Sequence, residues 1–344
     1  MTYYAALDVS LRSVAICIID NDGDIQFETS VPSEIEDITQ VLEAFDGDIV
    51  SIGLEAGVLT QFLTYGLQST GYEVVCMEAR QVKAALSAMR NKTDKNDARG
   101  IAQILRSGWY SPVHVKSMRS HEIRALLSSR RAVLSKCVDL ENEVRGLFKI
   151  FGIKLPPRLD HGPFDKKVRP LIEADAALAH ALLPLLEARL ALYQVFRELD
   201  KRVRRMALED PICCRLMSAP GVGVVTALTF KAGVDDPTRF KSSRTVAAHF
   251  GLTPKRFQSG DMDISGHISR AGDPDVRAAL YISAHSLMTR SAKYSSLKVW
   301  GMQLAKKRGH RRAVVAVARK LAVILHRMWI DDSQFHWSSE GSAA

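Results

Sequence analysis

Residues 3–29, YYAALDVSLRSVAICIIDNDGDIQFET, decide the fold of the N-terminal region. Two apolar stretches, 3–9 and 14–19, have the length and composition of strands. The turn residues at 20–23 separate the second stretch from a third, at 25–29. Strands joined by such short connections pair antiparallel. The stretch therefore predicts three antiparallel strands.

Helices and further strands alternate after this stretch. A helix is expected at 34–45, with Ser33 as its N-cap and Glu36 completing a capping box. The other expected elements are strands at 49–54 and 72–77 and helices at about 57–70, 79–89 and 94–107. Three antiparallel strands followed by strand–helix crossovers are the order of a ribonuclease-H-like α/β fold.

The rest of the chain is expected to be mostly helical. Apolar spacing predicts a helix over 119–151 and a second over 182–208, interrupted or started near Pro184. A loop with Gly162, Pro163 and Pro170 separates them. The pair is typical of a helical hairpin or a coiled-coil dimerisation arm.

Helices are predicted to continue beyond residue 210 to about residue 335. A short helix is expected at 245–250, and a flexible polar loop is expected between Gly251 and Gly272. Residues 331–344 are predicted to form a frayed tail. A length of 344 residues indicates two or three domains.

Charge is divided unevenly along the chain, whose formal net charge is +9. Residues 1–80 contain 14 acids and two bases, whereas the other 264 residues carry 45 bases and 24 acids. Residues 276–330 contain 12 bases and no acid. The excess of bases after residue 80 predicts a polyanionic partner such as nucleic acid. The acidic N-terminal region argues against a simple DNA-coating protein.

Composition also excludes several classes of protein. Five cysteines, with only Cys213 and Cys214 close together, suit neither a disulfide scaffold nor a metal-binding motif. No run of 18 apolar, charge-free residues occurs, and the N-terminus lacks the basic region of a signal peptide. We therefore expect a cytoplasmic protein with no membrane partner.

Four acids are candidates for a metal site. Asp8 lies in the first strand, and Glu55 follows the strand at 49–54. Asp94 and Asp97 lie on one face at the start of a helix. Taken singly, a solvent-facing strand end or the helix dipole would explain each of them. In a ribonuclease-H-like fold they could converge, and such hard oxygen ligands suit Mg²⁺ and phosphoryl transfer.

Several basic or glycine-rich segments are candidates for phosphate contact. Residues 216–227 resemble the hairpin of a helix-hairpin-helix motif, although a tight turn between packed helices is the simpler interpretation. The loop at 251–272 could hold a phosphate backbone or be merely solvated. Residues 306–312 carry five bases without nearby acids. The predicted nucleic-acid contacts are Lys92, Arg99, Gly221, Gly223, Lys255, Arg256, Arg270, Lys306, Lys307, Arg308, Arg311 and Arg312.

Taken together, these segments resemble the transposases of insertion-sequence family one-ten. The resemblance to their DEDD blocks lies in ALDV at 6–9, GLEAG at 53–57 and NKTDKNDAR at 91–99. The resemblance to their C-terminal domain lies in APGVG at 219–223, GLTP at 251–254, QSG at 258–260 and ISRAG at 268–272. The match covers nearly the whole chain, in order and with compatible spacing.

The resemblance implies the organisation of the chain. It implies a RuvC-like DEDD domain at 1–112, a helical coiled-coil arm at 113–210 and a mostly helical, serine-bearing transposase domain at 211–335. Residues 336–344 would form a tail.

The resemblance also implies a mechanism and partners. Asp8, Glu55, Asp94 and Asp97 would bind Mg²⁺, and Ser259 would be the nucleophile that forms a phosphoserine link with DNA. The implied partners are donor and target DNA, a structured guide RNA that bridges them, and further copies of the chain, as dimers that join into a tetramer. Because Ser259 and Asp8 are far apart in sequence, we hypothesise that they form one composite site.

Other functions remain open at this point. A RuvC-like nuclease or junction resolvase would use metal-activated water and leave Ser259 inert. A degenerate, non-catalytic remnant is disfavoured because all four acids and the serine are present. An actin-like kinase is disfavoured because no glycine-rich loop follows the first strand.

Overall fold

The computed structural model describes residues 1–87, 91–260 and 262–337. The chain divides into two compact units, Met1–Lys116 and Ser117–Ala344. The second unit contains both the two long helices and the C-terminal helices, so the predicted boundary between residues 210 and 211 stays a prediction.

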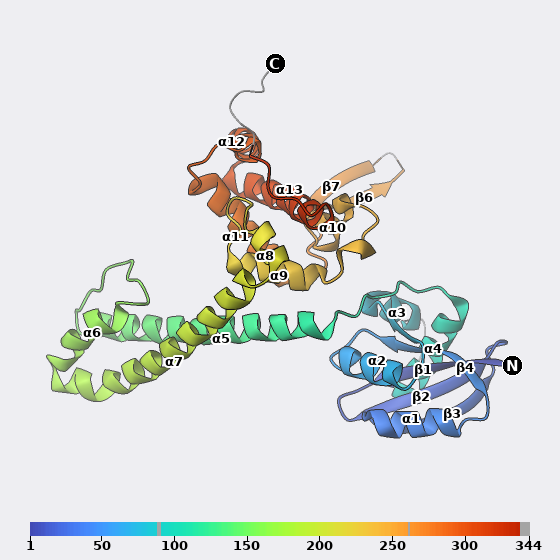
Figure 1. Ribbon diagram of the computed structural model, residues 1–344. Coiled ribbons are helices and arrows are strands. Elements are labelled where there is room, and N and C mark those ends of the chain that lie inside the picture. Colours follow the sequence, from blue (N-terminus) through green and yellow to red (C-terminus); the bar gives the residue numbers. More distant parts are fainter. Residues whose placement is uncertain (88–90, 261, 338–344) are drawn as a thin grey trace, which may run out of the picture. The chain divides into compact units, whose positions relative to one another are not determined.

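The first unit is built on a five-stranded sheet in the order β3-β2-β1-β4-β5 (Figure 1). Strands β1 and β2 pair antiparallel, as do β2 and β3, while β4 pairs parallel with both β1 and β5. This arrangement confirms the predicted antiparallel triplet and the crossovers that follow it. The strands are β1 (Thr2–Val9), β2 (Ser13–Asp20), β3 (Ile25–Pro32), β4 (Asp48–Glu55) and β5 (Val74–Met77).

Helices cover both faces of this sheet. Leu7 lies in the core on one face, whereas its neighbour Ala6 lies in the core on the other. Because both faces are buried, β1 and β2 are almost continuously apolar. Helices α1 and α2 contribute to the first core, and α3 and α4 contribute to the second. They are α1 (Ile35–Ala44), α2 (Thr60–Ser69), α3 (Ala79–Leu86) and α4 (Asp94–Ser107).

Two of these helices differ from the prediction at their ends. The capping box at Ser33 was wrong, because Glu34 is the N-cap and no side chain caps α1. The Ser33 hydroxyl instead donates to the carbonyl of Ser10 at 3.0 Å, which ties the end of β3 to the turn after β1. The helix predicted at 79–89 ends at Leu86 as described, and its last two predicted residues lie outside the described residues.

Two long helices, α5 (Met118–Ile150) and α7 (Ala176–Leu208), pack against each other in the second unit. They confirm the predicted helical hairpin. The buried positions Cys137, Glu141, Val144 and Phe148 on α5 follow the four-three-four spacing of a coiled-coil seam over about three turns. A coiled-coil arm that dimerises stays a prediction.

The connection between these helices is more ordered than predicted. Residues Phe164–Glu173 form helix α6, where we expected a loop. Phe164, Val168 and Ile172 recur every four residues and are buried, so the apolar stripe outweighs the cost of Pro170 inside the helix. Helix α7 begins at Ala176, earlier than predicted, because the Asp175 side chain caps its first turn.

Within the described residues, α7 is the one helix long and apolar enough to cross a membrane by length and composition alone. It packs against α5 and α6, with Leu178, Leu182 and Leu186 buried. The expected absence of a membrane partner stays a prediction.

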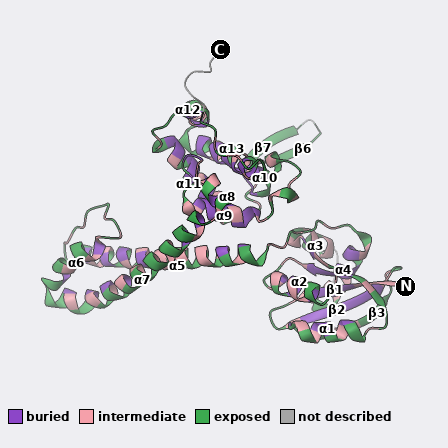
Figure 2. Cartoon of the chain, viewed as in Figure 1, coloured by how far each residue is buried: buried purple, intermediate pink, exposed green. Residues whose placement is uncertain are grey.

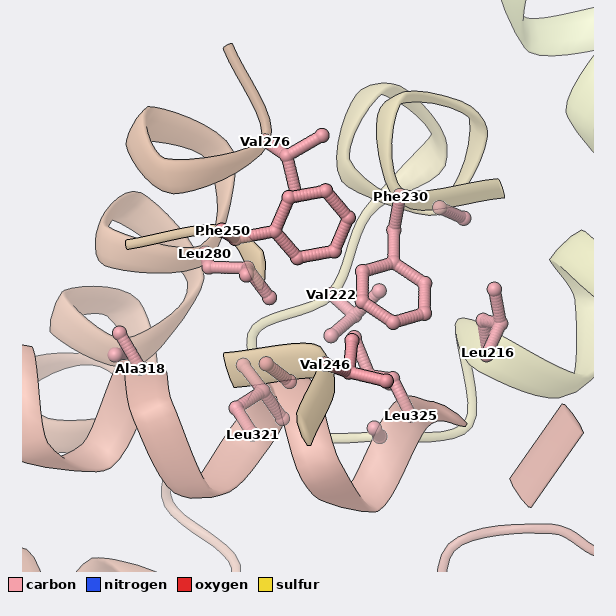
Figure 3. Packing of buried hydrophobic residues seen from close by; sticks show 14 of the residues in the cluster. Leu216, Val222, Phe230, Val246, Phe250, Val276, Leu280, Ala318, Leu321 and Leu325 are labelled. Atoms are coloured by element: carbon pink, nitrogen blue, oxygen red, sulfur yellow. The ribbon is translucent and has the colours of Figure 1, made fainter. Parts of the chain in front are cut away.

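The C-terminal helices enclose one apolar core (Figure 3). The rings of Phe230 and Phe250 lie 6.0 Å apart in this core, beside Val222 and Leu280. These aromatic and aliphatic side chains join helices that are distant in sequence. The helices are α8 (Pro211–Leu216), α9 (Val224–Val234), the 3-10 turn η1 (Pro237–Arg239), α10 (Ser243–His249), α11 (Pro274–Thr289), α12 (Ser296–Arg308) and α13 (His310–Ile330).

Two C-terminal predictions differ from the structure, and the first of them was wrong. The flexible loop between Gly251 and Gly272 contains a β-hairpin, formed by β6 (Pro254–Ser259) and β7 (Met262–Ile268). Cross-strand pairs stabilise it, including Phe257 opposite Ile264. The other concerns the frayed tail predicted at 331–344. In its described part the Phe335 N–H donates to the Ser218 hydroxyl at 2.9 Å, and residues 338–344 lie outside the described residues.

Candidate active site

The sheet register places Asp8 and Glu55 side by side. Leu7 of β1 pairs with Leu54 of β4, and the two acids are the next residues in these parallel strands. Neighbouring strands lie about 4.8 Å apart, and equivalent residues point to the same face. Both acids therefore project toward the face covered by α4, at the carboxyl end of the sheet. Ala15, which pairs with Asp8, belongs to the core on that face.

Helix α4 carries the other two acids to the same edge. Ala98, Ile101 and Ala102 are buried against the sheet, which fixes the face that α4 presents. Thr93 is its N-cap and accepts from the Asn96 N–H at 3.2 Å. Asp94 and Asp97 lie in the first turn. Helix packing and capping thus hold both acids near the ends of β1 and β4.

A cavity of about 450 Å³ opens at this edge. Its lining includes Asp8, Glu55 and Asp97 together with Lys92. Thr60 also lines it, and its hydroxyl accepts from the Gly57 N–H at 2.7 Å, which shapes the loop after β4. The participation of Lys92 was not predicted, because its basic character alone indicated nucleic-acid contact.

Electrostatics shows that the four acids influence one another. Burial is the largest cause that raises the pKa of Asp8 to about 6. The negative charges of Asp97, Asp94 and Glu55 also raise it, in that order, while Lys92 lowers it. Burial, followed by the charge of Asp97, raises the pKa of Glu55 as well. The site therefore gathers negative charge that a cation would stabilise.

The donor set fits a hard divalent cation, since all four candidates are carboxylates. Within the described residues, however, no three His, Cys, Asp or Glu side chains are arranged closely enough to hold a metal ion. The acids would have to draw closer around a cation. Burial is the larger cause of the raised pKa of Asp8, and the repulsion among the acids that adds to it is the interaction that a cation would relieve.

We expect Asp8→Asn to stabilise the metal-free protein in a pH-dependent way. The ordinary pKa of aspartate is 3.8, and that of Asp8 in the folded protein is about 6. At a pH between these two values the folded state keeps a proton that the unfolded state releases, so the stability of the fold decreases as the pH rises through this range. Asparagine avoids this loss. Allowing for solvent screening of a half-buried group, the melting temperature should rise by about 2–5 °C at pH 8 and much less at pH 4.

Calorimetry in the presence of a chelator measures this effect. Asp22→Asn, at an exposed turn of the same unit, is the matched control and should change little at either pH. An equal gain for Asp8→Asn at both pH values would contradict the raised pKa.

Ser259 is the last residue of β6, at the tip of the hairpin in the second unit. It pairs with Met262, and Gly260, which follows it, has a left-handed φ of +55°. Ser265 pairs with Arg256, so it lies on the opposite face of the hairpin from Ser259. The structure thus gives the serines of the predicted loop different positions.

Two predicted nucleic-acid contacts are paired within the chain. The Arg99 guanidinium donates to both carboxylate oxygens of Glu28, at 2.5 and 2.8 Å. Arg256 donates to both oxygens of Asp263 across the hairpin, at 2.7 Å each. Such pairs hold local structure, and nucleic-acid contact by either arginine stays a prediction.

The glycines of the predicted helix-hairpin-helix turn differ in their surroundings. A Cβ on Gly221 would lie 2.3 Å from the Ser283 carbonyl oxygen, and its φ is +80°. Gly221 therefore permits a close turn against α11, as the simpler interpretation expects. Gly223 has open space around it at the N-cap of α9.

The remaining candidate contacts are exposed. Lys255 lies on β6, and Arg270 follows β7 with a left-handed φ of +57°. The segment at 306–312 spans the end of α12 and the start of α13, and every residue in it is exposed. In the described part of the chain, none of its five bases forms an ion pair with an acid. This exposure keeps the segment accessible to a polyanion.

Comparison with known proteins finds a transposase family model that matches within each part of the chain. A family model described as a DEDD-type IS110 transposase matches residues 5–152, and one described as the IS116/IS110/IS902 transposase family matches residues 213–299. The chain is 31% identical over 244 residues to the transposase for insertion sequence element IS1111A of Coxiella burnetii. That alignment covers 68% of this chain and 66% of the relative.

Two further relatives align over more of their length. A probable family 20 transposase of Pseudomonas aeruginosa is 26% identical over 80% of this chain and 82% of its own. The transposase for insertion sequence element IS1328 of Yersinia enterocolitica is 25% identical over 86% of this chain and 87% of its own.

Proposed function

The chain belongs to the IS116/IS110/IS902 family of transposases, and on that premise we propose that it cuts and rejoins DNA at insertion-sequence ends and at a target. The observation that carries the proposal is the gathering of Asp8, Glu55, Asp94 and Asp97 at one edge of the first unit, where burial and the charges of the other three acids raise the pKa of Asp8. Such a site suits the binding of a phosphodiester through a divalent cation.

We propose that these four carboxylates hold Mg²⁺. When bound, the ion would neutralise charge on the scissile phosphate. The carboxylates would hold that ion in place, and one of them would accept a proton during the reaction. The hard oxygen donors support this choice of metal.

The proposed nucleophile is the Ser259 hydroxyl. Its oxygen attacks the scissile phosphorus, a Ser259 O–P bond forms, and the bond from phosphorus to the leaving DNA oxygen breaks. The serine proton passes to a carboxylate and then to the leaving oxygen. Attack by the hydroxyl of another strand reverses these steps and frees Ser259. The number of phosphodiester bonds is conserved, so no nucleotide cofactor is needed.

The proposed partners are donor DNA, target DNA and a structured non-coding guide RNA that bridges them. The bases at 306–312 are exposed and form no ion pair with an acid of the described residues, which supports binding of a polyanion but does not distinguish DNA from RNA. We also propose that the chain acts as a homo-oligomer, as dimers that join into a tetramer in the active complex. Its expected location is the cytoplasm.

Covalent trapping tests the proposed mechanism against a nuclease that uses activated water. Protein and labelled DNA carrying an element end are incubated with Mg²⁺, with the transcript of the flanking non-coding DNA added to half of the reactions. The products are then denatured and separated. A DNA-labelled protein band that a chelator abolishes supports the serine recombinase. Cleavage without such a band would favour the nuclease, and cleavage independent of the transcript would contradict RNA guidance.

A further inference from the structure

The hairpin that carries Ser259 is not held by a hydrophobic core. All six residues of β6 are exposed, as are most of those in β7 (Figure 2). An isolated two-stranded hairpin is only marginally stable in water. The orientation of its tip must therefore be set by contacts at its base.

At the base of the hairpin, the backbone segment before β6 crosses close to the segment after β7. Gly251 precedes β6 with a φ of +67°, and a Cβ there would lie 2.4 Å from the backbone of Ala271. Gly272 follows β7 with a φ of +66°, and a Cβ there would lie 2.1 Å from the His249 carbonyl oxygen. The Arg270 N–H also donates to the Gly251 carbonyl at 3.1 Å. The crossing brings together the two ends of the hairpin.

One side chain of α11 joins both ends of this crossing. The Arg277 Nη1 donates to the Ala271 carbonyl at 2.6 Å and to the Phe250 carbonyl at 3.2 Å. It also lies within 3.1 Å of the Gly272 carbonyl oxygen and 3.4 Å of that of Asp273. Phe250 lies before β6 and Ala271 after β7, so a single guanidinium nitrogen fixes the two ends relative to each other.

The helix that holds Arg277 is itself anchored. The Asp273 carboxylate caps α11 by accepting from the Asp275 and Val276 N–H groups. Its other oxygen forms an ion pair with Arg124 of α5. Val276, beside Arg277, is fully buried in the core. Arg277 therefore connects an exposed hairpin to a rigid helix.

We propose that Arg277 is a positioning residue for the reaction at Ser259, a role that rests on the proposed function. From Pro254 to Ser259 the strand extends about 17 Å. A tilt of about 10° at the base would displace the tip by about 3 Å, whereas a misplacement of about 1 Å can cost about 100-fold in rate. Arg277 touches no reacting atom and acts by holding the hairpin at one angle.

The test measures the rate of covalent adduct formation at saturating DNA for Arg277→Met, Arg277→Gln and Arg277→Lys. DNA affinity and hydrogen exchange of the hairpin amides are measured alongside. Arg119→Met is the matched control, because it removes one arginine and an exposed ion pair with Glu122. Ser259→Ala reports on the proposed function separately.

We expect Arg277→Met and Arg277→Gln to slow adduct formation about 100-fold, with DNA affinity within about threefold of the unsubstituted protein. Hairpin amides should exchange faster while those of the core keep their protection. Arg277→Lys should recover at least tenfold, because its ammonium group can still donate to the two carbonyls. Arg119→Met should behave like the unsubstituted protein.

The role of Arg277 would be overturned if Arg277→Met formed the adduct within threefold of the normal rate while Ser259→Ala formed none. An adduct that persists in Ser259→Ala would instead overturn the proposed nucleophile. If Arg277→Met does not fold, the comparison of Arg277→Gln with Arg277→Lys decides. Equal rates in these two variants, with equal hairpin exchange, would also overturn the proposal.

Discussion

Ser259→Ala should abolish the denaturation-resistant protein–DNA adduct and slow strand joining by about 10⁴-fold or more. Removal of a nucleophile from a hydroxyl-dependent enzyme costs this much, because the remaining groups bind and polarise the phosphate but form no covalent intermediate. Gel separation of labelled DNA after denaturation measures the adduct, and single-turnover kinetics measures joining. DNA affinity should be unchanged, since alanine alters only one exposed hydroxyl.

The hairpin supplies the control for this substitution. Ser265 lies on the same hairpin but pairs with Arg256, on the face opposite to Ser259. Ser265→Ala should keep adduct formation within about threefold, as is usual for a surface substitution away from the reacting atoms. If Ser265→Ala lost the adduct and Ser259→Ala retained it, Ser265 and not Ser259 would be the nucleophile. Cleavage that survives in Ser259→Ala without any adduct would favour the activated-water nuclease.

Sequence patterns predicted the first unit well because its elements are locally determined. Apolar runs such as residues 14–19 have the length and composition of strands buried on both faces, and the expected helix at 94–107 matches α4 residue for residue. What the sequence could not supply was register. The pairing of Leu7 with Leu54 makes Asp8 and Glu55 neighbours, and only the folded sheet shows it.

The missed elements share one physical cause, which is that tertiary contacts outweighed local signals. Pro170 and the glycines around it indicated a loop, but the buried stripe from Phe164 to Ile172 stabilises α6. Glycine and charge at 251–272 indicated a flexible loop, but four consecutive residues of β6, from Arg256 to Ser259, pair with residues of β7. Arg277 carried no sequence signal, because its carbonyl partners meet only at the hairpin base.

Asp8→Asn and Glu55→Gln should each lower cleavage at least about 10³-fold, while DNA affinity measured without Mg²⁺ stays the same or improves slightly. Both substitutions keep the shape of the side chain but remove a negative charge that would bind the cation, so they remove electrostatic stabilisation of the transition state. Asp22→Asn makes the same charge change at an exposed turn and should leave cleavage within about threefold. Normal cleavage by Asp8→Asn would contradict a metal-binding role for this edge of the sheet.

Mixtures of these variants test whether the acids of one protomer serve the serine of another. Asp8→Asn alone and Ser259→Ala alone should both be inactive, since each lacks one half of the proposed chemistry. If the halves act across protomers, a mixed oligomer contains a site with an intact acid cluster and an intact serine, and equal mixing should restore a fraction of the normal joining rate. The restored fraction should depend on the mixing ratio and peak near equal amounts. No recovery at any ratio, with exchange of subunits shown by labelled protomers, would mean that each protomer uses its own acids and its own serine.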